Sequence, residues 1–288
     1  MEPKVSILIP VYNTATLLPR CLSSVTEQTL RDIEIICVDD GSTDTSYDVL
    51  QEWARKDSRI VVLRQSNGRQ GKARNTALAV ARGEYIGMVD SDDYIPADYF
   101  ERLYDAAERN KADIAVCGIT KEKKHGDKII VSYDKEVTEV DAAAKLRLCN
   151  CPPDFYVYNK LYRKDMLSRI GLRFDEGVQF EDVVFVMRAV CESSLLVTAP
   201  GSAYRYVLNE GSTINSRQTA AKQRQKYMAH KAMVDYVALR GISIPEKYKN
   251  ITVKHFSLAG ICLWKIKEKG GVRTLRLFDF LPVWSQKR

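Results

Sequence analysis

Four short apolar segments, each followed by polar residues, constrain the fold of this chain more than any other feature. The first is VSILIPVYNT (residues 5–14), where β-branched residues recur within an almost continuous apolar run. The others are IEIICVDDGSTD (33–44), RIVVLRQSNG (59–68) and EYIGMVDSDDYIP (84–96). Such runs predict strands that are covered on both faces, as is typical of a parallel sheet.

Helical patterns lie between and after these strands. Apolar residues recur at helical spacing in 15–29, and helices are also predicted at 47–56, 72–82 and 99–111. Strands that alternate with helices predict an α/β fold, with a doubly wound, mostly parallel sheet flanked by helices. Ligands of such sheets bind beyond the carboxyl ends of the strands, where all four polar clusters lie.

The pattern is looser in the second half of the chain. A further strand is predicted at 112–120, and helices are predicted at 141–149 and 220–240. The sequence contains no internal repeat and no low-complexity linker. We therefore expect one large domain that ends near residue 215, followed by a small helical C-terminal tail over 216–288.

Composition restricts the partners and the location of the protein. The 288 residues carry a formal net charge of +7, which suits an anionic partner such as a nucleotide, a phospholipid surface or a nucleic acid. Seven cysteines without CxxC spacing favour reduced thiols over a disulfide framework, and the three histidines do not form a metal-binding set. The N-terminus lacks a signal-peptide pattern and no apolar run reaches about 20 residues, so a cytoplasmic location is expected.

The densest group of acids is DSDD, at residues 90–93. Three carboxylates at the end of an apolar strand repel one another and need a cation or hydrogen-bond donors nearby. Mg²⁺ and Mn²⁺ prefer oxygen ligands and are commonly held by one or two carboxylates together with substrate phosphates. An acidic helix N-cap before Pro96 would explain the same residues as plain local structure. The position of DSDD beside the other strand ends favours a site for Mn²⁺ or Mg²⁺.

Two other strand ends also carry polar residues. Turn and N-cap chemistry explains GSTD, but it does not explain the adjacent carboxylates Asp39 and Asp40, one of which could accept a hydrogen bond from a base or ribose. QSNGRQGKARN places Asn67, Lys72 and Arg74 in a cationic, glycine-containing loop that leads into a helix, which suits the phosphates of a nucleotide. The spacing of a Walker motif is absent from this loop.

Taken together, these motifs resemble the family 2 glycosyltransferases, which are inverting enzymes of the GT-A fold. SILIPVYN, VDDGSTD, the GKARN segment from Gly71 to Asn75, and DSDD occur in the order and approximate spacing of that family over the first hundred residues. The later half resembles a bacterial branch of the family through NKLYRKDML (159–167), VQFEDVVF (178–185) and YRYVLNEGSTINS (204–216).

The resemblance implies a domain organisation and an activity. A catalytic domain would cover 1–215, with a nucleotide-binding half at about 1–120 and an acceptor half at about 121–215. Such an enzyme moves a sugar from a nucleotide-diphosphate donor, expected here to be a UDP-sugar, to a hydroxyl of a glycan or lipid-linked glycan. The sugar, the acceptor and the linkage are not defined by the sequence.

The resemblance also assigns roles to residues near the donor. Pro10, Val11 and Tyr12 would form a wall against the base. Asp40 would meet a uracil-like edge, and Asp90 would meet the ribose. The implied donor-binding residues are Pro10, Val11, Tyr12, Asp40, Asn67, Lys72, Arg74, Asp90 and Ser91. Asp92, the second acid of the DxD pattern, would bind the metal ion on the diphosphate.

The acidic pair in VQFEDVVF implies the catalytic base. The second acid maps to Asp182, and the adjacent Glu181 is the competing candidate. Apolar neighbours could raise the pKa of a carboxyl here by desolvation, although an ordinary helix start has the same pattern. The resemblance also suggests, more loosely, that Tyr204, Arg205, Tyr206, Ser212 and Thr213 form a lid over the donor phosphates.

Three alternatives compete with this interpretation. A non-catalytic nucleotide or membrane-surface module of the same fold would be expected to have lost DxD or ED, and both are intact. Nucleic-acid binding is suggested by net charge alone. A nucleotidyltransferase would also bind nucleotides at strand ends, but its chemistry does not predict the late ED pair.

The C-terminal sequence mixes aromatic, aliphatic and basic residues. Trp264 and Trp284 are interleaved with cations such as Lys265, Lys267 and Arg276. Amphipathic basic segments of this kind lie in the headgroup region of anionic membranes. The tail is therefore predicted either to contact the inner face of the cell membrane or to pack on the catalytic domain or on another subunit.

Overall fold

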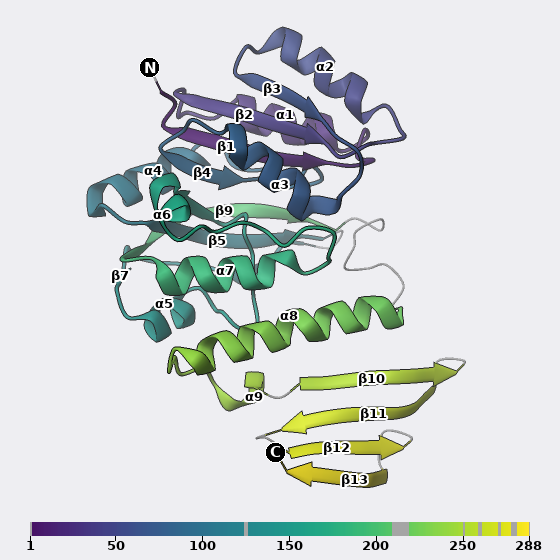
Figure 1. The fold of residues 1–288 in the computed structure, drawn as a ribbon. Helices are drawn as coiled ribbons and strands as arrows, with labels where there is room; N and C mark the ends of the chain where they lie inside the picture. Colours follow the sequence, from purple (N-terminus) through teal and green to yellow (C-terminus); the bar gives the residue numbers. More distant parts are fainter. Residues whose placement is uncertain are drawn as a thin grey trace.

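The computed structural model describes residues 2–123, 126–208, 219–249, 251–258, 261–269, 272–277 and 281–287. Over these residues the strands form two separate sheets, one of nine strands and one of four antiparallel strands (Figure 1). The larger sheet contains the strands up to Val207, and the smaller sheet contains those that follow Lys249.

Parallel strands form the first half of the larger sheet. They are β1 (Val5–Val11), β2 (Ile33–Asp39), β3 (Ile60–Arg64) and β4 (Tyr85–Met88), in the spatial order β3-β2-β1-β4. Every residue of β1, β2 and β4 is buried, as expected for strands covered on both faces. The carboxyl ends of these strands share one edge, so the four motifs of the first hundred residues meet there.

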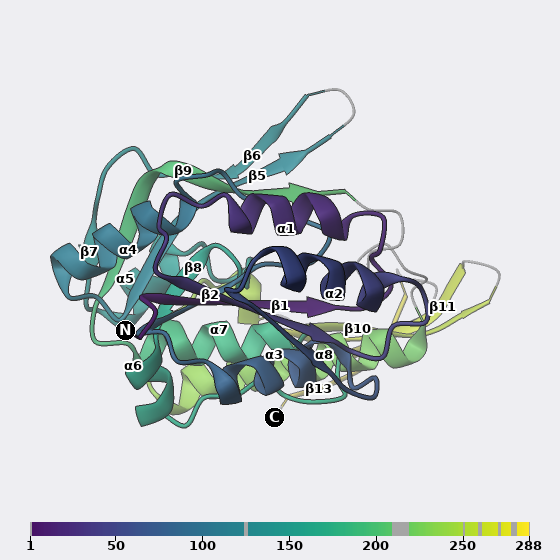
Figure 2. The ribbon, with the colours of Figure 1, turned by 90° about the horizontal axis from the view of Figure 1, so that it is seen from above.

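Helices cover both faces of these strands. The first three are α1 (Leu18–Thr26), α2 (Ser46–Lys56) and α3 (Arg69–Val80). Helices α1 and α3 lie on opposite faces of the sheet (Figure 2). The predicted α/β alternation is thus confirmed, with helix ends that differ from the predicted ones by a few residues.

The second half of the sheet is mixed, which the sequence did not predict. Strand β8 (Lys160–Arg163) lies between β4 and β5 (Ile114–Glu122) and is antiparallel to both. Strand β9 (Leu196–Val207) then pairs in parallel with β5. Two short strands, β6 (Lys128–Val131) and β7 (Thr138–Glu139), pair with β5 and β9. Because β8 is only four residues long, its sequence carries little periodic signal.

The remaining helices of this unit pack around the mixed half. They are α4 (Tyr99–Asn110), α5 (Ala142–Leu148), α6 (Lys164–Arg169) and α7 (Glu181–Glu192). Helices α4 and α5 confirm the predictions at 99–111 and 141–149. Helix α7 lies on the same face of the sheet as α3, so the start of α7 comes close to α3 (Figures 1 and 2).

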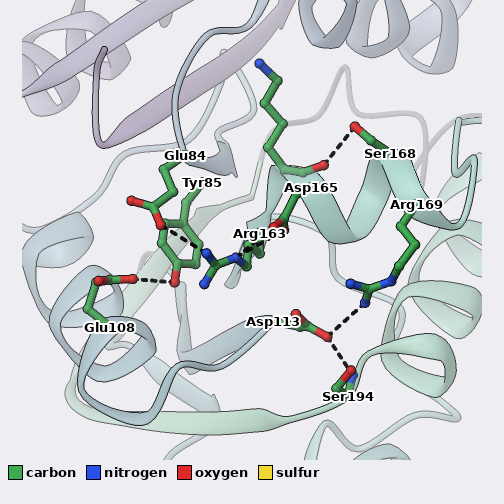
Figure 3. Close-up of polar contacts among 10 residues, drawn as sticks. Glu84, Tyr85, Glu108, Asp113, Arg163, Asp165, Ser168, Arg169 and Ser194 are labelled. Atoms are coloured by element: carbon green, nitrogen blue, oxygen red, sulfur yellow. Dashed lines mark hydrogen bonds and ion pairs between the residues drawn. The ribbon is translucent and has the colours of Figure 1, made fainter. Parts of the chain in front are cut away.

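Arg163, Lys164 and Asp165 of the NKLYRKDML motif lie at the edge opposite the strand carboxyl ends. Arg163 pairs with Glu84, which precedes β4, and with Asp165 at the start of α6 (Figure 3). Nearby, Asp113 accepts a hydrogen bond from the backbone N–H of Ser194 at 2.6 Å and pairs with Arg169 at 3.4 Å (Figure 3). These contacts join the ends of β4, β5 and β8, and they assign this part of the motif to the scaffold.

The C-terminal region departs from the predicted helical tail. Helix α8 (Ala220–Leu239) confirms the predicted helix at 220–240, and a short helix, α9 (Glu246–Lys249), follows. The next segments are antiparallel strands: β10 (Ile251–Leu258), β11 (Ile261–Lys269), β12 (Val272–Leu277) and β13 (Leu281–Lys287). A Gly-Gly pair between β-branched runs is a hairpin signal, and it outweighs the helical interpretation of this sequence.

Candidate functional site

The loop after β1 is bonded to the GSTD turn that follows β2. Asn13 has a positive φ of 52°, a conformation that asparagine tolerates better than most residues. Its Oδ1 accepts hydrogen bonds from the backbone N–H groups of Thr43 (2.8 Å) and Asp44 (3.3 Å). Its own N–H donates to Ser42 Oγ at 3.1 Å. The loops after β1 and β2 are therefore one connected structure.

Asp40 connects the end of β2 to the loop after β3. Its buried carboxylate accepts hydrogen bonds from Gln65 Nε2 (2.6 Å) and from the backbone N–H of Gly68 (2.9 Å). The start of α3 follows directly at Arg69. Asp40 thus fixes the loop that carries Asn67. The sequence predicts that Asp40 lies at the strand-end edge, but it does not predict the hydrogen bonds to Gln65 and Gly68.

The DSDD turn is fixed from both sides. Ser91 Oγ accepts a hydrogen bond from Thr14 Oγ1 at 3.0 Å, which joins the turn to the loop after β1. On the other side, the N–H of Asp90 donates to Tyr204 Oη at 3.0 Å, and the N–H of Val207 donates to Asp93 at 2.7 Å. The turn is therefore held between β1 and β9.

The acids of DSDD lie in different environments. Asp93 is buried, and burial together with the charges of Asp90 and Asp92 raises its pKa to about 9. Asp92 is only half-buried. Asp93 therefore serves as a neutral internal anchor at pH 7, whereas Asp92 retains access to the surface of the site.

Arg74 joins DSDD to the ED pair. Its guanidinium is buried, with Nη2 donating to Asp90 at 2.8 Å and Nη1 donating to Glu181 at 2.6 Å. The two carboxylates hold the pKa of Arg74 above its usual value in spite of burial. These ion pairs connect α3, the end of β4 and the first residue of α7, which are separated by up to 107 positions in the sequence.

Asp182 lies next to this ionic network without being part of it. Among the described residues, no other side chain forms a hydrogen bond or ion pair with its carboxyl group. Desolvation and the negative charge of Glu181 raise the pKa of Asp182 to about 7, although Arg74 acts in the opposite direction. The two acids are therefore distinct: Glu181 is paired and buried, and Asp182 is half-buried and titrates near neutrality.

The other predicted donor residues differ in exposure. Pro10 and Val11 are buried within β1, whereas the side chain of Tyr12 is 47% exposed. Asn67 is exposed, and Lys72 is half-buried. The structure therefore brings all of these residues to the strand-end edge and leaves Tyr12, Asn67 and Lys72 accessible there.

The predicted lid was wrong for Tyr204. Its ring is fully buried, stacks on Tyr158 with ring centroids 4.1 Å apart, and supports the DSDD turn from beneath. Arg205 pairs with Asp127 instead of covering the site. Ser212 and Thr213 lie outside the described residues.

Whether the site can hold a divalent cation depends on the acids of DSDD. Among the residues that the structure describes, no three His, Cys, Asp or Glu side chains are grouped so that they could hold a metal ion. Asp93 is buried and bonds inward, and Asp90 accepts from Arg74. Asp92 is half-buried and keeps access to the surface, so it is the acid best placed to meet a cation. One carboxylate combined with donor phosphates is a common arrangement for Mg²⁺. These residues fit a cation that binds together with a nucleotide.

The family model described as "Glycosyl transferase family 2" matches residues 6–171, which contain DSDD, Arg74 and the connected strand-end loops. This chain belongs to that family. The glycosyltransferase is 34% identical over 249 residues to the uncharacterized glycosyltransferase EpsJ of Bacillus subtilis, covering 84% of this chain and 72% of EpsJ. It is also 34% identical over 211 residues to the poly(ribitol-phosphate) beta-glucosyltransferase of Bacillus spizizenii, covering 71% of this chain and only 32% of that protein.

Solved structures share the GT-A fold. S. aureus TarS 1–349, in complex with UDP-GlcNAc, is similar with a TM-score of 0.70 at 24% identity, covering 85% of this glycosyltransferase and 69% of TarS 1–349. The mannosyltransferase PcManGT of Pyrobaculum calidifontis, in complex with GDP-Man and Mn²⁺, has a TM-score of 0.55 at 19% identity, covering 86% and 68% of the two chains. Within the described residues, no helix has the length and apolar character needed to span a bilayer.

The environment of Asp182 predicts a pH-dependent change in stability. The unfolded chain loses this proton near pH 4, whereas the folded protein keeps it until about pH 7, so the parent loses stability as pH rises through this window. Asp182→Asn removes the ionisation. Its melting temperature relative to the parent should therefore increase between pH 4 and pH 7 and then level off. Thermal unfolding at a series of pH values measures this difference, and a difference independent of pH would contradict it.

Proposed function

We propose that this glycosyltransferase transfers a sugar from a UDP-sugar to a hydroxyl of a surface glycan or lipid-linked glycan, with inversion and with Asp182 as the general base. The observation that carries this proposal is the half-buried Asp182, held beside the Arg74–Asp90 pair at the strand-end edge. A carboxyl group with a pKa of about 7 is ionised in a large fraction of molecules at neutral pH and is still basic enough to accept a proton.

Asp182 is favoured over Glu181 because their partners differ. The carboxylate of Glu181 accepts from Arg74 at 2.6 Å and is buried, so taking up a proton would break a buried ion pair. Asp182 has no such partner among the described side chains. It would accept the proton of the acceptor hydroxyl as the new glycosidic bond forms and the bond to the nucleoside diphosphate breaks. Inversion in one displacement requires no covalent intermediate.

The assignment of the donor rests on the site and on its neighbours. Accessible Tyr12, Asn67 and Lys72 lie on the strand-end edge with Asp90, where nucleotides bind in doubly wound sheets. The similar TarS structure contains UDP-GlcNAc, which supports a UDP-sugar as donor. In this proposal the buried residues Pro10, Val11, Asp40, Arg74 and Ser91 shape the donor site around these contacts.

The proposed acceptor class follows from the relatives. One acts on poly(ribitol-phosphate), and others include a chondroitin synthase of Escherichia coli that is 43% identical over 103 residues. Both names refer to a polymer, which supports a glycan as the acceptor class proposed here. We propose that the catalytic domain spans residues 1–215, because the last strand of the larger sheet ends at Val207.

A Mn²⁺ or Mg²⁺ ion would be held by Asp92 together with the donor diphosphate. When bound, such an ion supplies positive charge that stabilises the departing diphosphate. The protein contributes the rigid DSDD turn, because the bonds of Ser91, Asp90 and Asp93 fix the backbone on both sides of Asp92.

The role of the base predicts different outcomes for two isosteric variants. Asp182→Asn should reduce transfer about 10²- to 10⁴-fold while UDP affinity is retained, because the amide keeps the shape but accepts no proton. Glu181→Gln should retain measurable transfer, because the amide oxygen can still accept from Arg74. Steady-state transfer rates and calorimetric UDP binding test both variants. The reverse ranking, with both proteins folded, would move the base to Glu181.

The assignment of the metal ligand predicts that Asp92→Ala abolishes the enhancement of UDP binding by Mn²⁺ and leaves the fold intact. The side chain of Asp92 is only half-buried, so its loss should not open the core. Calorimetry of UDP with and without Mn²⁺ measures this effect. Asp165→Ala, which removes an exposed acid at the opposite edge of the sheet, is the control. Undiminished Mn²⁺-dependent affinity in Asp92→Ala would refute the assignment.

A panel of nucleotide-sugars separates this function from a non-catalytic nucleotide-binding module of the same fold. Release of free nucleoside diphosphate from one donor supports transfer, and weak hydrolysis without acceptor already identifies the base. A module without catalytic activity would bind a nucleotide and release nothing. A nucleotidyltransferase would instead consume a sugar phosphate and release pyrophosphate.

Peripheral contact with an anionic membrane through residues 251–287 is part of the proposal. The sequence of β11 and β12 contains Lys265, Lys267, Lys269, Arg273 and Arg276, and each cation near an anionic surface contributes about 1 kcal/mol of binding. We expect the full chain to float with anionic vesicles and a chain that ends at residue 249 to float less. Equal flotation of the two proteins would exclude the tail as an anchor.

A further inference from the structure

Asn75 of the GKARN segment is buried and forms hydrogen bonds with the segment that leads to the ED pair. Its Nδ2 donates to the carbonyl oxygen of Phe174 at 2.9 Å and to Glu176 Oε1 at 2.9 Å. Its Oδ1 accepts a hydrogen bond from the backbone N–H of Phe174 at 3.0 Å. The side-chain amide of Asn75 thus bonds both the N–H and the carbonyl oxygen of Phe174. Its NH₂ group acts as the donor and its oxygen as the acceptor.

Gly71, one helical turn before Asn75, packs against the same segment. A Cβ atom at this position would lie 2.4 Å from the carbonyl oxygen of Asp175 and 3.3 Å from Cγ of Glu181. A Cβ atom cannot approach a carbonyl oxygen as closely as 2.4 Å, so no residue other than glycine fits here without a shift of the backbone. The backbone of residue 175 therefore approaches α3 as closely as it does because residue 71 is glycine.

The segment is also fixed by contacts on its other side. The ring of Phe174 stacks on Phe185 of α7 with centroids 3.8 Å apart. Arg74 lies over the same ring at 5.3 Å and pairs with Glu181. Residues 174–176 are thus held between α3 and α7, a few positions before the proposed base.

The start of α7 depends on this support. Phe180, the residue before Glu181, has a positive φ of 65°, an uncommon conformation for an aromatic residue. A strained residue persists only where the surrounding structure determines it. Contacts on both sides of Phe180, from Asn75 upstream and from Arg74 downstream, are suited to hold the backbone in this conformation.

We propose that Asn75 is a positioning residue for the proposed base: by anchoring residues 174–176 to α3, it sets the orientation of Asp182 at the start of α7. The inference rests on the proposed function of Asp182. The glycine and asparagine of the GKARN segment face residues 174–181. This segment therefore has a role on the acceptor side of the reaction, in addition to any contact with the donor.

The test compares variants of the full chain by transfer kinetics and by hydrogen exchange. Asn75→Ala removes the three hydrogen bonds, and Gly71→Ala inserts a methyl group against Asp175 while improving the intrinsic helix propensity of α3. Both variants should lower kcat for transfer by on the order of 10²-fold, as expected for a displaced catalytic group. UDP affinity should change little. Exchange of the backbone amides at 174–182 should become faster.

Thr198→Val is the matched control for general destabilisation. Thr198 is buried at the start of β9 and bonds Val137 N–H and the carbonyl oxygen of Lys135, at the opposite end of β9 from the site. Its loss should lower the melting temperature without a comparable loss of kcat and without faster exchange at 174–182. Asn75→Gln keeps both amide functions and should restore part of the activity that Asn75→Ala loses.

The outcomes separate this inference from the proposed function. Unchanged exchange at 174–182, or faster exchange with unchanged kcat, would overturn the role of Asn75 even if Asp182→Asn is inactive. If Asn75→Ala lost kcat and UDP affinity together, and Thr198→Val lost both to the same extent, the effect would be general destabilisation. That result would also overturn the role of Asn75. A parent protein that binds UDP but releases none from any UDP-sugar would instead refute the proposed function.

Discussion

The rest of the site depends on the two ion pairs that the buried guanidinium of Arg74 forms. It places one positive charge between Asp90 at the end of β4 and Glu181 at the start of α7, and both carboxylates are within hydrogen-bond distance. Removing one partner of a buried ion pair strongly destabilises a protein, because the remaining charge is left buried without a partner. The two halves of the sheet are therefore joined at the point where donor and acceptor would meet.

The arrangement around Arg74 also separates the roles of neighbouring acids. Glu181 and Asp182 are adjacent in sequence, but about 100° of rotation per helical residue directs them differently. Pairing with Arg74 keeps Glu181 in the scaffold, while desolvation and the charge of Glu181 leave Asp182 with a pKa of about 7. Asp93 and Asp92 show the same division, with one acid buried beneath the turn and the other half-exposed. In each pair one acid, Glu181 or Asp93, holds the scaffold together, and its neighbour, Asp182 or Asp92, is the candidate for a role in the reaction.

Much of the fold followed from local patterns. The apolar runs of β1, β2 and β4 and the helical spacing of α1 and α4 were strong because each element is long or fully buried. Strand β8 is not predictable from periodicity, because it has only four residues and packs as an antiparallel insertion. The tail is predicted as helical from its mixed apolar and basic sequence, but it forms antiparallel strands. The motifs predicted which edge holds the site, since parallel strands place their carboxyl ends together.

The sequence by itself determined the α/β alternation, the family resemblance and the residue types at the strand ends, because these depend on periodicity and short motifs. Only the tertiary structure decided the partners. Arg74 is enclosed by two carboxylates, which its local sequence does not indicate. Tyr204 is predicted in a lid but lies beneath the DSDD turn, and Asn75 bonds a segment 99 residues away. Long-range pairing depends on how separate elements pack, and the local sequence around any one of these residues carries no record of that packing.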